Sequence, residues 1–534
     1  MWTPHWRTAE QVGTKLPGRG RESGGWRFAL STGIFWLGAI LVAMTLTGTL
    51  VLVSLDLIHG NLSPHERAAV YLIAPVLLGA GVSLLALLRA ARLLKRTGGP
   101  GKRGLPRVTI DLGNRKHAKT LALSGLGGAF LIGLVSLGGY QSYHFTESTE
   151  FCGIVCHEVM NPHFVTHQNS AHAEVGCVEC HVGDGAEWYL RTKLNGLQEV
   201  RAYLTGSYEL PIKSPLRNLR PPRDTCEKCH WPEKFIGNSE KTITHFSREE
   251  TSAPYSIRLL LKVGGGEHGA SRGIHWHVSG GNKVEYIAAD ETRREIPWVK
   301  VTDSAGRVTV YRSTQTDSGG SLHESREMDC VDCHNRPTHA FEDPDSAVNE
   351  ALRERSIDPA LPDIKDVAMA LLEEAHGSTP EAMKAIEGRI RERYSTAELP
   401  EAATRETAIA GAITALQKIY ARNFFPEGRV DWSTHPDFIG HFRWDGCFRC
   451  HDGEHVSEDG RTISNDCSTC HLIVGQGEGL GELSELPYQV QEFIHPPDGE
   501  PMEAGTRCVE CHGAPPATEY SPERNQAGVI AAAD

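Results

Sequence analysis

Three long hydrophobic stretches precede residue 143 and contain no charged side chain. They occupy residues 28–55, 68–88 and 120–140. Each is at least as long as the roughly 20 apolar residues that a helix needs to cross the hydrocarbon core of a bilayer. Buried helices of soluble domains seldom lack charge over such a length, and the glycines of the third stretch suit close helix packing in lipid. The pattern therefore predicts three transmembrane helices.

The segments that flank these stretches differ in charge, and the difference predicts their orientation. Residues 1–27 and the loop 89–119 are basic, and this loop holds ten Lys or Arg against one acid, Asp111. Basic loops stay in the cytoplasm. We therefore expect a cytoplasmic amino terminus and an exported region from about residue 144 onward. A cleaved signal peptide is the alternative for the first stretch, but its apolar run is too long and lacks a clear small-x-small cleavage site.

Beyond residue 240, short stretches alternate or run apolar and are rich in β-branched side chains. These stretches are residues 258–263, 283–288 and 298–312. Within the last of them, Asp303-Ser304-Ala305-Gly306 has the composition of a hairpin turn. We expect a small β insertion over about residues 240–315.

Residues 345–425 show a helical spacing of Ala, Glu, Leu and Arg instead. Thr379-Pro380-Glu381 has Pro at the position that suits the first turn of a helix. The pattern predicts three or four helices, which we interpret as a linker over residues 346–430 that acts as a spacer or an interaction surface. Residues 513–534 are polar and are expected to form a disordered tail.

Composition adds a large charge imbalance to this picture. Residues 1–143 hold 16 Lys or Arg and 5 Asp or Glu, and the rest of the chain holds 38 and 62. The exported region is thus strongly acidic. This is weak evidence for basic partners, because many proteins are acidic for solubility alone. Nothing in the pattern favours a nucleic-acid partner.

All fourteen cysteines lie in motifs that end in histidine. In a Cys-x-x-Cys-His run, two thiols form thioethers with the haem vinyl groups and the adjacent His binds the iron. The six motifs with this spacing are Cys177/Cys180/His181, Cys226/Cys229/His230, Cys330/Cys333/His334, Cys447/Cys450/His451, Cys467/Cys470/His471 and Cys508/Cys511/His512. A further motif, Cys152/Cys156/His157, comes first in the chain and has three intervening residues. The sequence predicts seven c-type haems.

Two alternatives bear on these motifs. Zinc ribbons also use Cys-x-x-Cys pairs, but they do not need a His after every second Cys. The first motif could be a degenerate site, although its longer spacing still lets both thiols reach one porphyrin edge. No cysteine remains for a disulfide or for a separate catalytic thiol.

Seven haem irons need up to seven further axial ligands, and the chain has ample histidine for them. Fourteen His lie outside the motifs beyond Cys152. The candidates that lie near a motif are His172, His339, His441, His455 and His495, with His435 in reserve. For the first haem we expect Met160, a ligand that raises the potential relative to His, and His163 is the alternative.

Three histidines compete for the third haem, and they are His245, His275 and His277. If His275-Trp276-His277 forms a strand, both imidazoles point to one face, because side chains alternate along a strand. The residues by themselves leave the choice among the three open.

The run from Cys152 to His339 resembles the NapC/NirT/NrfH type of membrane-anchored, quinol-oxidising tetrahaem cytochrome. The shared features are a membrane anchor that leads into a Cys-His motif followed by Met, the Ser170 and His172 pair before the second motif, and a final Cys-Val-Asp-Cys-His with His339 five residues on. Three spans and seven motifs resemble most the inner-membrane, seven-haem, ImcH-like branch. The shared motifs cover about residues 120–340.

This resemblance implies a quinol site beside the first haem. The family's Lys, twelve residues after the second motif's His, falls on Lys193, and its acidic position falls on Val200, beside Glu199. We hypothesise that Lys193 orients the quinol oxygen or stabilises quinolate and that Glu199 accepts a proton. The resemblance also implies His172 as the distal ligand of the fourth haem and His339 as that of the second.

The expected fold is a membrane-anchored multihaem cytochrome c with three N-terminal transmembrane helices at 28–143. A haem-packed, mainly α and irregular periplasmic region follows, with a tetrahaem domain at 144–345 that contains the β insertion and a trihaem domain at 431–512. The expected function is oxidation of quinol in the bacterial inner membrane and transfer of electrons to periplasmic c-type cytochromes, in a respiratory chain that can lead outside the cell. The alternative is a terminal reductase of a nitrogen or sulfur oxyanion at an open haem iron. Homo-oligomerisation is left open.

Overall fold

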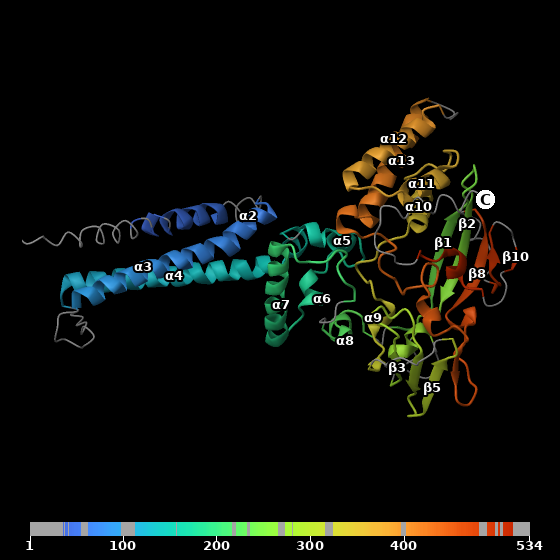
Figure 1. Ribbon diagram of the computed structural model, residues 1–534, viewed down its shortest axis with the longest axis horizontal. Helices are drawn as coiled ribbons and strands as arrows, with labels where there is room; N and C mark the ends of the chain where they lie inside the picture. Colours follow the sequence, from blue (N-terminus) through green and yellow to red (C-terminus); the bar gives the residue numbers. More distant parts are fainter. Residues whose placement is uncertain are drawn as a thin grey trace, which may run out of the picture. The chain divides into compact units, whose positions relative to one another are not determined.

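The computed structural model describes two compact units, Met1–Thr146 and Glu147–Asp534. We call them the N-terminal and C-terminal units and describe each by itself (Figure 1). The described residues are 36, 38–40, 42–54, 62–97, 113–155, 157–215, 220–231, 235–264, 273–279, 281–315, 324–396, 402–479, 489–496, 500–501 and 506–515. Most of the predicted tail lies outside them.

Long apolar helices make up most of the described part of the N-terminal unit. One continuous helix consists of α2 (Pro64–Ala68), the π-helix η1 (Ala69–Ile73) and α3 (Ala74–Thr97), and α4 spans Arg115–Thr146. The segment His65–Arg89 and the whole of α4 are long and apolar enough to cross a membrane. They coincide with two of the three predicted spans.

Tyr71 joins these two helices. Its backbone carbonyl accepts a hydrogen bond from the Ser142 hydroxyl of α4, and its ring centroid lies 6.1 Å from that of Phe145. Tyr71 belongs to the π-turn η1, a wide turn that locally alters the helical ladder. The π-turn therefore marks the contact between the helices.

The first predicted span is described only in part. Its described residues include the apolar helix Gly38–Ser54, and the rest of residues 28–55 lies outside the described residues. Gly81 of α3 lies so close to this helix that a Cβ there would come within 2.5 Å of the Cγ2 atom of Val42. A larger residue at position 81 would push the two helices apart.

The glycines of α4 have no close neighbour among the described residues, so their expected packing role stays a prediction. Among the described residues, no atom lies within 4 Å of a Cβ placed at Gly125, Gly127, Gly128, Gly133 or Gly138. The close helix contacts among the described residues of this unit involve Gly81, and also Gly38, where a Cβ would come within 3.2 Å of Leu85.

The first sheet of the C-terminal unit combines strands from distant parts of the chain. It has the order β1 (Ser239–Phe246), β2 (Pro254–Leu261) and β8 (His471–Glu478), and all neighbours are antiparallel. β2 pairs with β8 so that Leu261 lies opposite His471. A strand that begins at the sixth motif thus completes a sheet of the predicted β insertion.

The second sheet also draws on both regions, and its order is β6-β3-β4-β5-β7. Its strands are β3 (Lys283–Ile287), β4 (Trp298–Thr302), β5 (Val308–Ser313), β6 (Arg326–Glu327) and β7 (His455–Ser457). A further short pair joins β9 (Ile494–His495) to β10 (Glu500–Pro501). The predicted boundary between the tetrahaem and trihaem domains is therefore crossed by two sheets.

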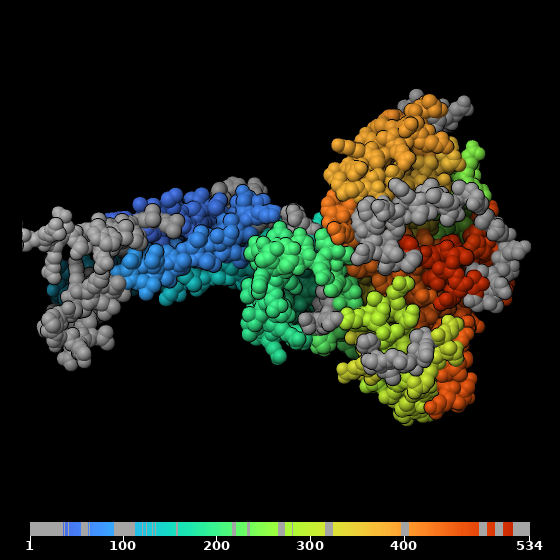
Figure 2. Space-filling model, viewed as in Figure 1, coloured from blue at the N-terminus to red at the C-terminus, as the bar shows by residue number. Residues whose placement is uncertain are grey.

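Four helices follow the fourth motif in the described part of the linker region. They are α10 (Pro344–Arg353), α11 (Ile364–Glu373), α12 (Thr379–Tyr394) and α13 (Ala402–Asn423). Their inward faces form the largest buried apolar cluster of the described residues. They appear in Figure 2 as one orange body, which we call the helical module.

The remaining helical elements carry or flank the cysteine motifs. They are η2 (Phe151–Val155), α5 (His157–Gln168), α6 (Cys177–His181), α7 (Ala186–Thr205), α8 (Pro222–Cys226), η4 (Ile274–Val278), α9 (Cys330–Cys333), η5 (Pro426–Gly428), η6 (Gly446–Arg449), η7 (Cys467–Thr469) and α14 (Cys508–His512).

The region around the first three motifs has almost no apolar core of its own. Apart from Pro162, Val182 is the only buried apolar side chain among the described residues of 147–230. Segments of this length cannot stay compact without burying surface. Another group must therefore fill their interior.

A buried ion pair fastens the helical module to the first sheet. The ammonium of Lys365, which is 4% exposed, lies 2.9 Å from a carboxylate oxygen of Asp345 and donates a hydrogen bond to the backbone carbonyl of Phe246 in β1. Burial acts to raise the pKa of Asp345, but His245 and Lys365 outweigh it and hold this pKa well below its ordinary value. The carboxylate is thus charged and needs its partner.

We expect the Lys365→Met variant to lose about 3 kcal/mol of unfolding free energy, because it leaves a buried carboxylate without its cation. Denaturant titration followed by far-UV circular dichroism measures this loss. Lys384→Met is the matched control, since Lys384 lies exposed on α12, and it should change the free energy by no more than about 0.5 kcal/mol. Equal effects of the two changes would contradict the structural role of the pair.

Candidate haem sites and their axial ligands

The regular motifs fold into single helical turns that gather both thiols on one side. The backbone N–H of the motif His donates to the carbonyl of the first Cys, at 2.9 Å for His230, 2.8 Å for His334 and 3.0 Å for His451. Residues three apart lie on the same face of such a turn. Two thiols can therefore reach one porphyrin edge while the His that follows points toward its centre.

Four motif cysteines are exposed, which differs from the buried position that is usual for a cofactor-binding residue. They are Cys180, Cys229, Cys467 and Cys511, and in each case the other cysteine of the motif is partly buried. Cys511 lies in the single turn α14, where Cys508 is its partly buried partner. A thioether holds haem by a covalent bond, so it does not depend on burial of the sulfur. The exposed Cys511 shows that the site at the last motif is not enclosed. It does not exclude haem attachment at this motif, which stays a prediction.

The first motif begins in a different kind of turn. Cys152 lies in η2, a π-helix, whose turn takes up more residues than an α-helical turn. This wider turn suits the extra residue between Cys152 and Cys156. Cys156 and the side chain of His157 lie outside the described residues.

Each of the six regular motif histidines faces a second histidine across a gap. The ring centroids lie 5.8–6.2 Å apart in every pair. The pairs are His181 with His339, His230 with His172, His334 with His275, His451 with His277, His471 with His441, and His512 with His495.

This spacing fits an iron held between two imidazoles. A metal–imidazole bond is about 2 Å long, and the ring centre lies about 1.1 Å beyond the nitrogen, so rings on opposite sides of one metal have centroids about 6.2 Å apart. Direct face-to-face stacking of two rings would bring the centroids closer. The residues present therefore fit haem irons with two histidine ligands.

Hydrogen bonds fix the orientation of many of these rings. In five of them the Nδ1 atom lies within 3.1 Å of a backbone carbonyl oxygen, which leaves Nε2 free to bind a metal. The pairs are His172 with Pro337, His275 with Val263, His277 with Ile274, His339 with His163, and His451 with Ser464.

The buried guanidinium of Arg336 could bind a haem propionate. Its guanidinium donates one hydrogen bond to the Ser214 hydroxyl, and its buried Nη2 atom has no hydrogen-bond partner among the described residues. Burial lowers the pKa of Arg336 to about 10, so it stays charged at neutral pH. A haem propionate is the kind of anion that a buried guanidinium binds.

Motifs that are consecutive in the chain are also neighbours in space. One cysteine of each motif interacts electrostatically with a cysteine of the next. The pairs are Cys152 with Cys177, Cys180 with Cys229, Cys226 with Cys330, Cys333 with Cys447, Cys447 with Cys470, and Cys467 with Cys508. Each motif therefore lies next to the one that follows it in the sequence, and we call this series from Cys152 to Cys508 the row of motifs.

The position of His172 differs from the expectation. Its ring lies 6.0 Å from that of His230, in the third motif, and another histidine faces His334. The Ser170 hydroxyl lies 2.7 Å from that of Thr338, and this contact holds the His172 turn beside the segment that follows the fourth motif. His172 is thus anchored near the fourth motif but points at the third. His339 lies opposite His181, in the second motif, as the resemblance implied.

None of the three histidines proposed for the third haem faces its motif. His275 faces His334 and His277 faces His451, because residues 274–278 form the 3₁₀ turn η4 in place of the expected strand. Residues two apart diverge in a 3₁₀ turn, whereas they share a face in a strand. His245 instead contacts Phe442 and the buried Asp345.

His455 does not have the free nitrogen that a ligand needs. Its Nδ1 atom lies 2.8 Å from a carboxylate oxygen of Asp452 and its Nε2 atom lies 2.6 Å from the carbonyl oxygen of Ile296. Its side chain is 1% exposed and supports strand β7. The expectation of His455 as an axial ligand is therefore wrong, whereas His441 and His495 face motif histidines.

The candidates for the first haem lie in α5, near the second motif. Met160 is partly buried there, and its position relative to the His157 side chain is outside the described residues. The ring of His163 lies 5.3 Å from that of His339, and burial lowers the pKa of His163 to about 3. His435 is also buried, and burial lowers its pKa to about 3. Both imidazoles are therefore neutral at neutral pH.

Lys193 of α7 pairs with an acid that sequence reasoning missed. Its ammonium lies 2.5 Å from a carboxylate oxygen of Glu147, and the side chains are 31% and 13% exposed. Glu199 is exposed and, at 100° per residue, points about 120° away from Lys193 around the helix. Glu147 directly follows α4 and is the first acid after the apolar stretch. This position was the feature of the sequence that could have indicated Glu147 as the partner of Lys193.

An exposed apolar stripe runs along α7 on the same side as Lys193. The side chains of Leu190, Leu194, Leu197 and Leu204 are 54–77% exposed. At 100° per residue these leucines and Lys193 lie within a sector of about 100°. An exposed apolar stripe of this size on a helix marks an interaction surface, because soluble surfaces seldom leave one uncovered.

Comparisons with known proteins bear on these sites. Residues 115–215 match the NapC/NirT cytochrome c family, N-terminal region. The chain is 40% identical to the cytochrome c-type protein ImcH of Geobacter sulfurreducens over 496 residues, which cover 91% of this chain and 96% of that protein. This chain is a NapC/NirT-type multihaem cytochrome c of the ImcH branch.

The comparisons also found a second, shorter match. This cytochrome is also 36% identical to the cytochrome c-type protein NrfH of Wolinella succinogenes, over 80 residues that cover 14% of the chain and 45% of that protein. No solved structure matches it. The family resemblance inferred from the motifs is confirmed, and the cytochrome is a membrane-anchored electron-transfer protein that carries covalently bound haem.

Two histidines beside the fifth motif provide a matched test of the ligand geometry. We expect His441→Met to give one haem methionine ligation and a higher potential, because Met ligation raises the potential relative to His. We expect His455→Met to leave all haem spectra unchanged and to lower stability by about 1–3 kcal/mol, since the partly buried Asp452 carboxylate and the buried Ile296 carbonyl lose a partner. Near-infrared and EPR spectra with redox titration measure the first effect, and thermal denaturation the second. A changed haem spectrum in His455→Met would contradict this prediction.

Proposed function

We propose that this cytochrome oxidises membrane quinol and passes the electrons along seven haems to periplasmic c-type cytochromes. The observation that carries the proposal is the single row of motifs in sequence order, which begins beside Lys193 and Glu147 and ends at Cys508. A row of cofactors in contact is what electron transfer over this length requires. The proposed location is the inner membrane, with three spans and a periplasmic haem region.

Lys193 and Glu147 are the proposed quinol-binding residues. Quinol releases two electrons and two protons. Haem in the first motif would accept these electrons one at a time. Glu147 would accept a proton from a quinol hydroxyl, and Lys193 would orient the quinol oxygen and stabilise its developing negative charge. The ion pair between them holds the Glu147 carboxylate beside the Lys193 ammonium.

The leucine stripe of α7 supports this assignment. Quinol is dissolved in lipid, so its site must open to an apolar environment. A helix that combines an apolar face with Arg191, Lys193 and Arg201 has the composition of an interfacial helix. Lys193 lies on the side of that face, where a quinol head group would leave the lipid.

The paired histidines argue against the alternative function, a terminal reductase. A substrate oxyanion needs an open iron position, and each regular motif histidine faces a second histidine at a distance that would close both positions. Closed irons transfer electrons but bind no substrate. The exported region carries a large excess of acidic residues, which favours a redox partner with a basic docking surface.

We expect Lys193→Leu and Glu147→Gln each to slow haem reduction by a soluble menaquinol analogue at least tenfold, because each removes a charge that acts in the transition state. Stopped-flow spectroscopy at the haem Soret band measures the rate, and haem content should be unchanged. Glu199→Gln is the matched control, and its haems should be reduced at the normal rate. A slow Glu199→Gln with a normal Glu147→Gln would contradict the assignment of the acid.

We expect the intact protein to carry seven haem additions by mass spectrometry, because the π-turn at Cys152 accommodates the longer first motif. Replacing Cys152 and Cys156 by Ala should leave six additions. The same change at Cys467 and Cys470 should also leave six and serves as the control. Six additions in the unaltered protein would show that the first motif carries no haem.

A further inference from the structure

The turn η4 lies between the fourth and fifth motifs and reaches both. His275 faces His334 with rings 6.2 Å apart and nearly parallel, at 4°. His277 faces His451 at 5.8 Å, with the rings at 80°. The Nδ1 atoms of His275 and His277 each lie 2.7 Å from a carbonyl oxygen. Two residues of one turn are thus oriented toward two different motifs.

The backbone around η4 is closely packed, which limits its movement. A Cβ at Gly273 would come within 2.3 Å of the Gly264 carbonyl oxygen, so this position accepts no larger residue. Ile274 donates a hydrogen bond to the carbonyl of Lys262, and the Asn282 amide donates to that of Trp276. The two imidazoles therefore have a fixed separation.

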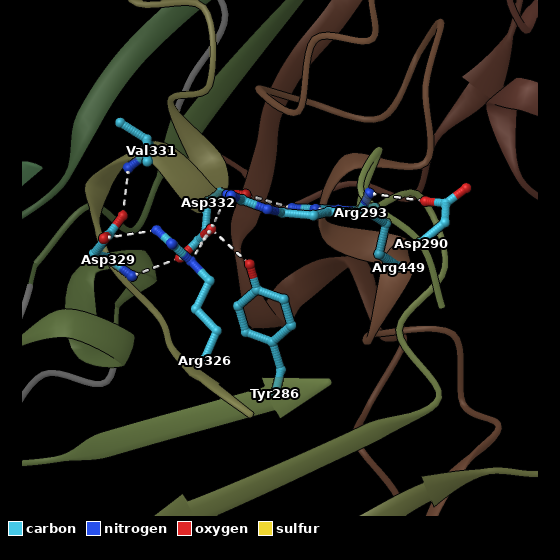
Figure 3. A network of polar contacts seen from close by, with 8 residues as sticks. All are labelled: Tyr286, Asp290, Arg293, Arg326, Asp329, Val331, Asp332 and Arg449. Carbon is cyan, nitrogen blue, oxygen red and sulfur yellow. Dashed lines mark hydrogen bonds and ion pairs between the residues drawn. The ribbon is translucent and has the colours of Figure 1, made fainter. Parts of the chain in front are cut away.

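The attachment loops of the same two motifs are clamped together by Arg449. This residue lies inside the fifth motif, and its guanidinium donates to the carbonyl of Asp332, inside the fourth motif, at 2.6 Å and to that of Arg293 at 2.9 Å. It also lies over the Phe438 ring, 3.6 Å from the centroid. Figure 3 shows Arg449 extended toward Asp332 and Arg293.

Asp332 is held in turn by a network of buried polar contacts. Its carboxylate accepts hydrogen bonds from the Tyr286 hydroxyl at 2.6 Å and from the guanidinium groups of Arg293 and Arg326 at 2.9 and 3.1 Å (Figure 3). Asp332 is 2% exposed. Since Tyr286 belongs to the second sheet, the network fixes both loops to that sheet.

We propose that the fourth and fifth haems form a rigid pair, in which η4 supplies both distal ligands and Arg449 sets the distance between the attachment loops. This pair joins the four-haem half of the cytochrome to the three-haem half. The inference deepens the proposed function, because it names the residues that hold the row of haems together at its middle. His275 and His277 are the ligands, and Arg449 is a positioning residue.

The ligands are tested by His275→Met and His277→Met in the full-length, detergent-purified holoprotein. Each variant should lose one of the bis-histidine low-spin signals in EPR, gain one methionine–iron band in the near infrared and show one haem of raised potential. The double variant should lose two signals, which shows that the residues serve different haems. His245→Met is the control and should lose none. An unchanged spectrum in either single variant, or a single loss in the double variant, would overturn the ligand assignment.

A second route covers the case in which the methionine variants do not assemble. His277→Gly produced and purified with imidazole should retain the bis-imidazole type of signal, and removal of imidazole should abolish one such signal. If added imidazole makes no difference to the spectrum of a fully haem-loaded His277→Gly, the assignment is wrong. None of these readouts requires quinol, so failure of quinol oxidation and failure of this inference are distinguishable.

The positioning role of Arg449 is tested by its conservative replacement. Arg449→Lys keeps the charge but cannot reach both carbonyls, so the magnetic interaction between two haems in the EPR spectrum should weaken while every ligand signal persists. Arg461→Lys is the matched control, because Arg461 is exposed and pairs with Asp459 in the same region. An unchanged magnetic interaction in Arg449→Lys would overturn the clamp.

Discussion

The C-terminal unit depends on one geometric constraint, which is that two imidazoles must face each other with their centres about 6 Å apart. Six histidine pairs meet this constraint, and partners such as His172 and His230 or His277 and His451 come from well-separated parts of the chain. The segment around the first motifs contains little apolar core, with Val182 as its main buried contribution. Covalently bound haem is the group that is available to fill the interior of this segment.

Conventional packing supplies the frame around this region. The helical module has its own buried core, and the ion pair of Lys365 with Asp345 fastens it to the first sheet. Both larger sheets include a strand from the C-terminal trihaem region, β7 or β8. The region of the first four motifs and the region of the last three motifs therefore share their secondary structure and are not separate bodies joined by a linker. This sharing places Arg449 against Asp332 and lets one turn serve two motifs.

The proposed site of electron input differs in its surroundings from the motifs further along the row. Lys193 lies beside an exposed leucine stripe on α7 and is paired with Glu147. Further along, each regular motif histidine faces a second histidine. In the proposed function, proton chemistry is confined to one end of the row. This separation suits a protein that takes two electrons from quinol and passes them on singly.

Local features of this cytochrome could be predicted from its residues alone. Cysteine spacing predicted the haem attachment motifs, uncharged length predicted the membrane stretches, and periodicity predicted the helices of the linker region, including the start of α12 at Thr379. Which histidine faces which motif depends instead on the tertiary structure. His455 was a plausible ligand until both its nitrogens were found in hydrogen bonds. The acid that lies beside Lys193 is Glu147 and not Glu199, because helical rotation turns Glu199 away from Lys193. Distal ligands come from loops whose direction is set by long-range contacts, such as that of Ser170 with Thr338, and no local pattern encodes them.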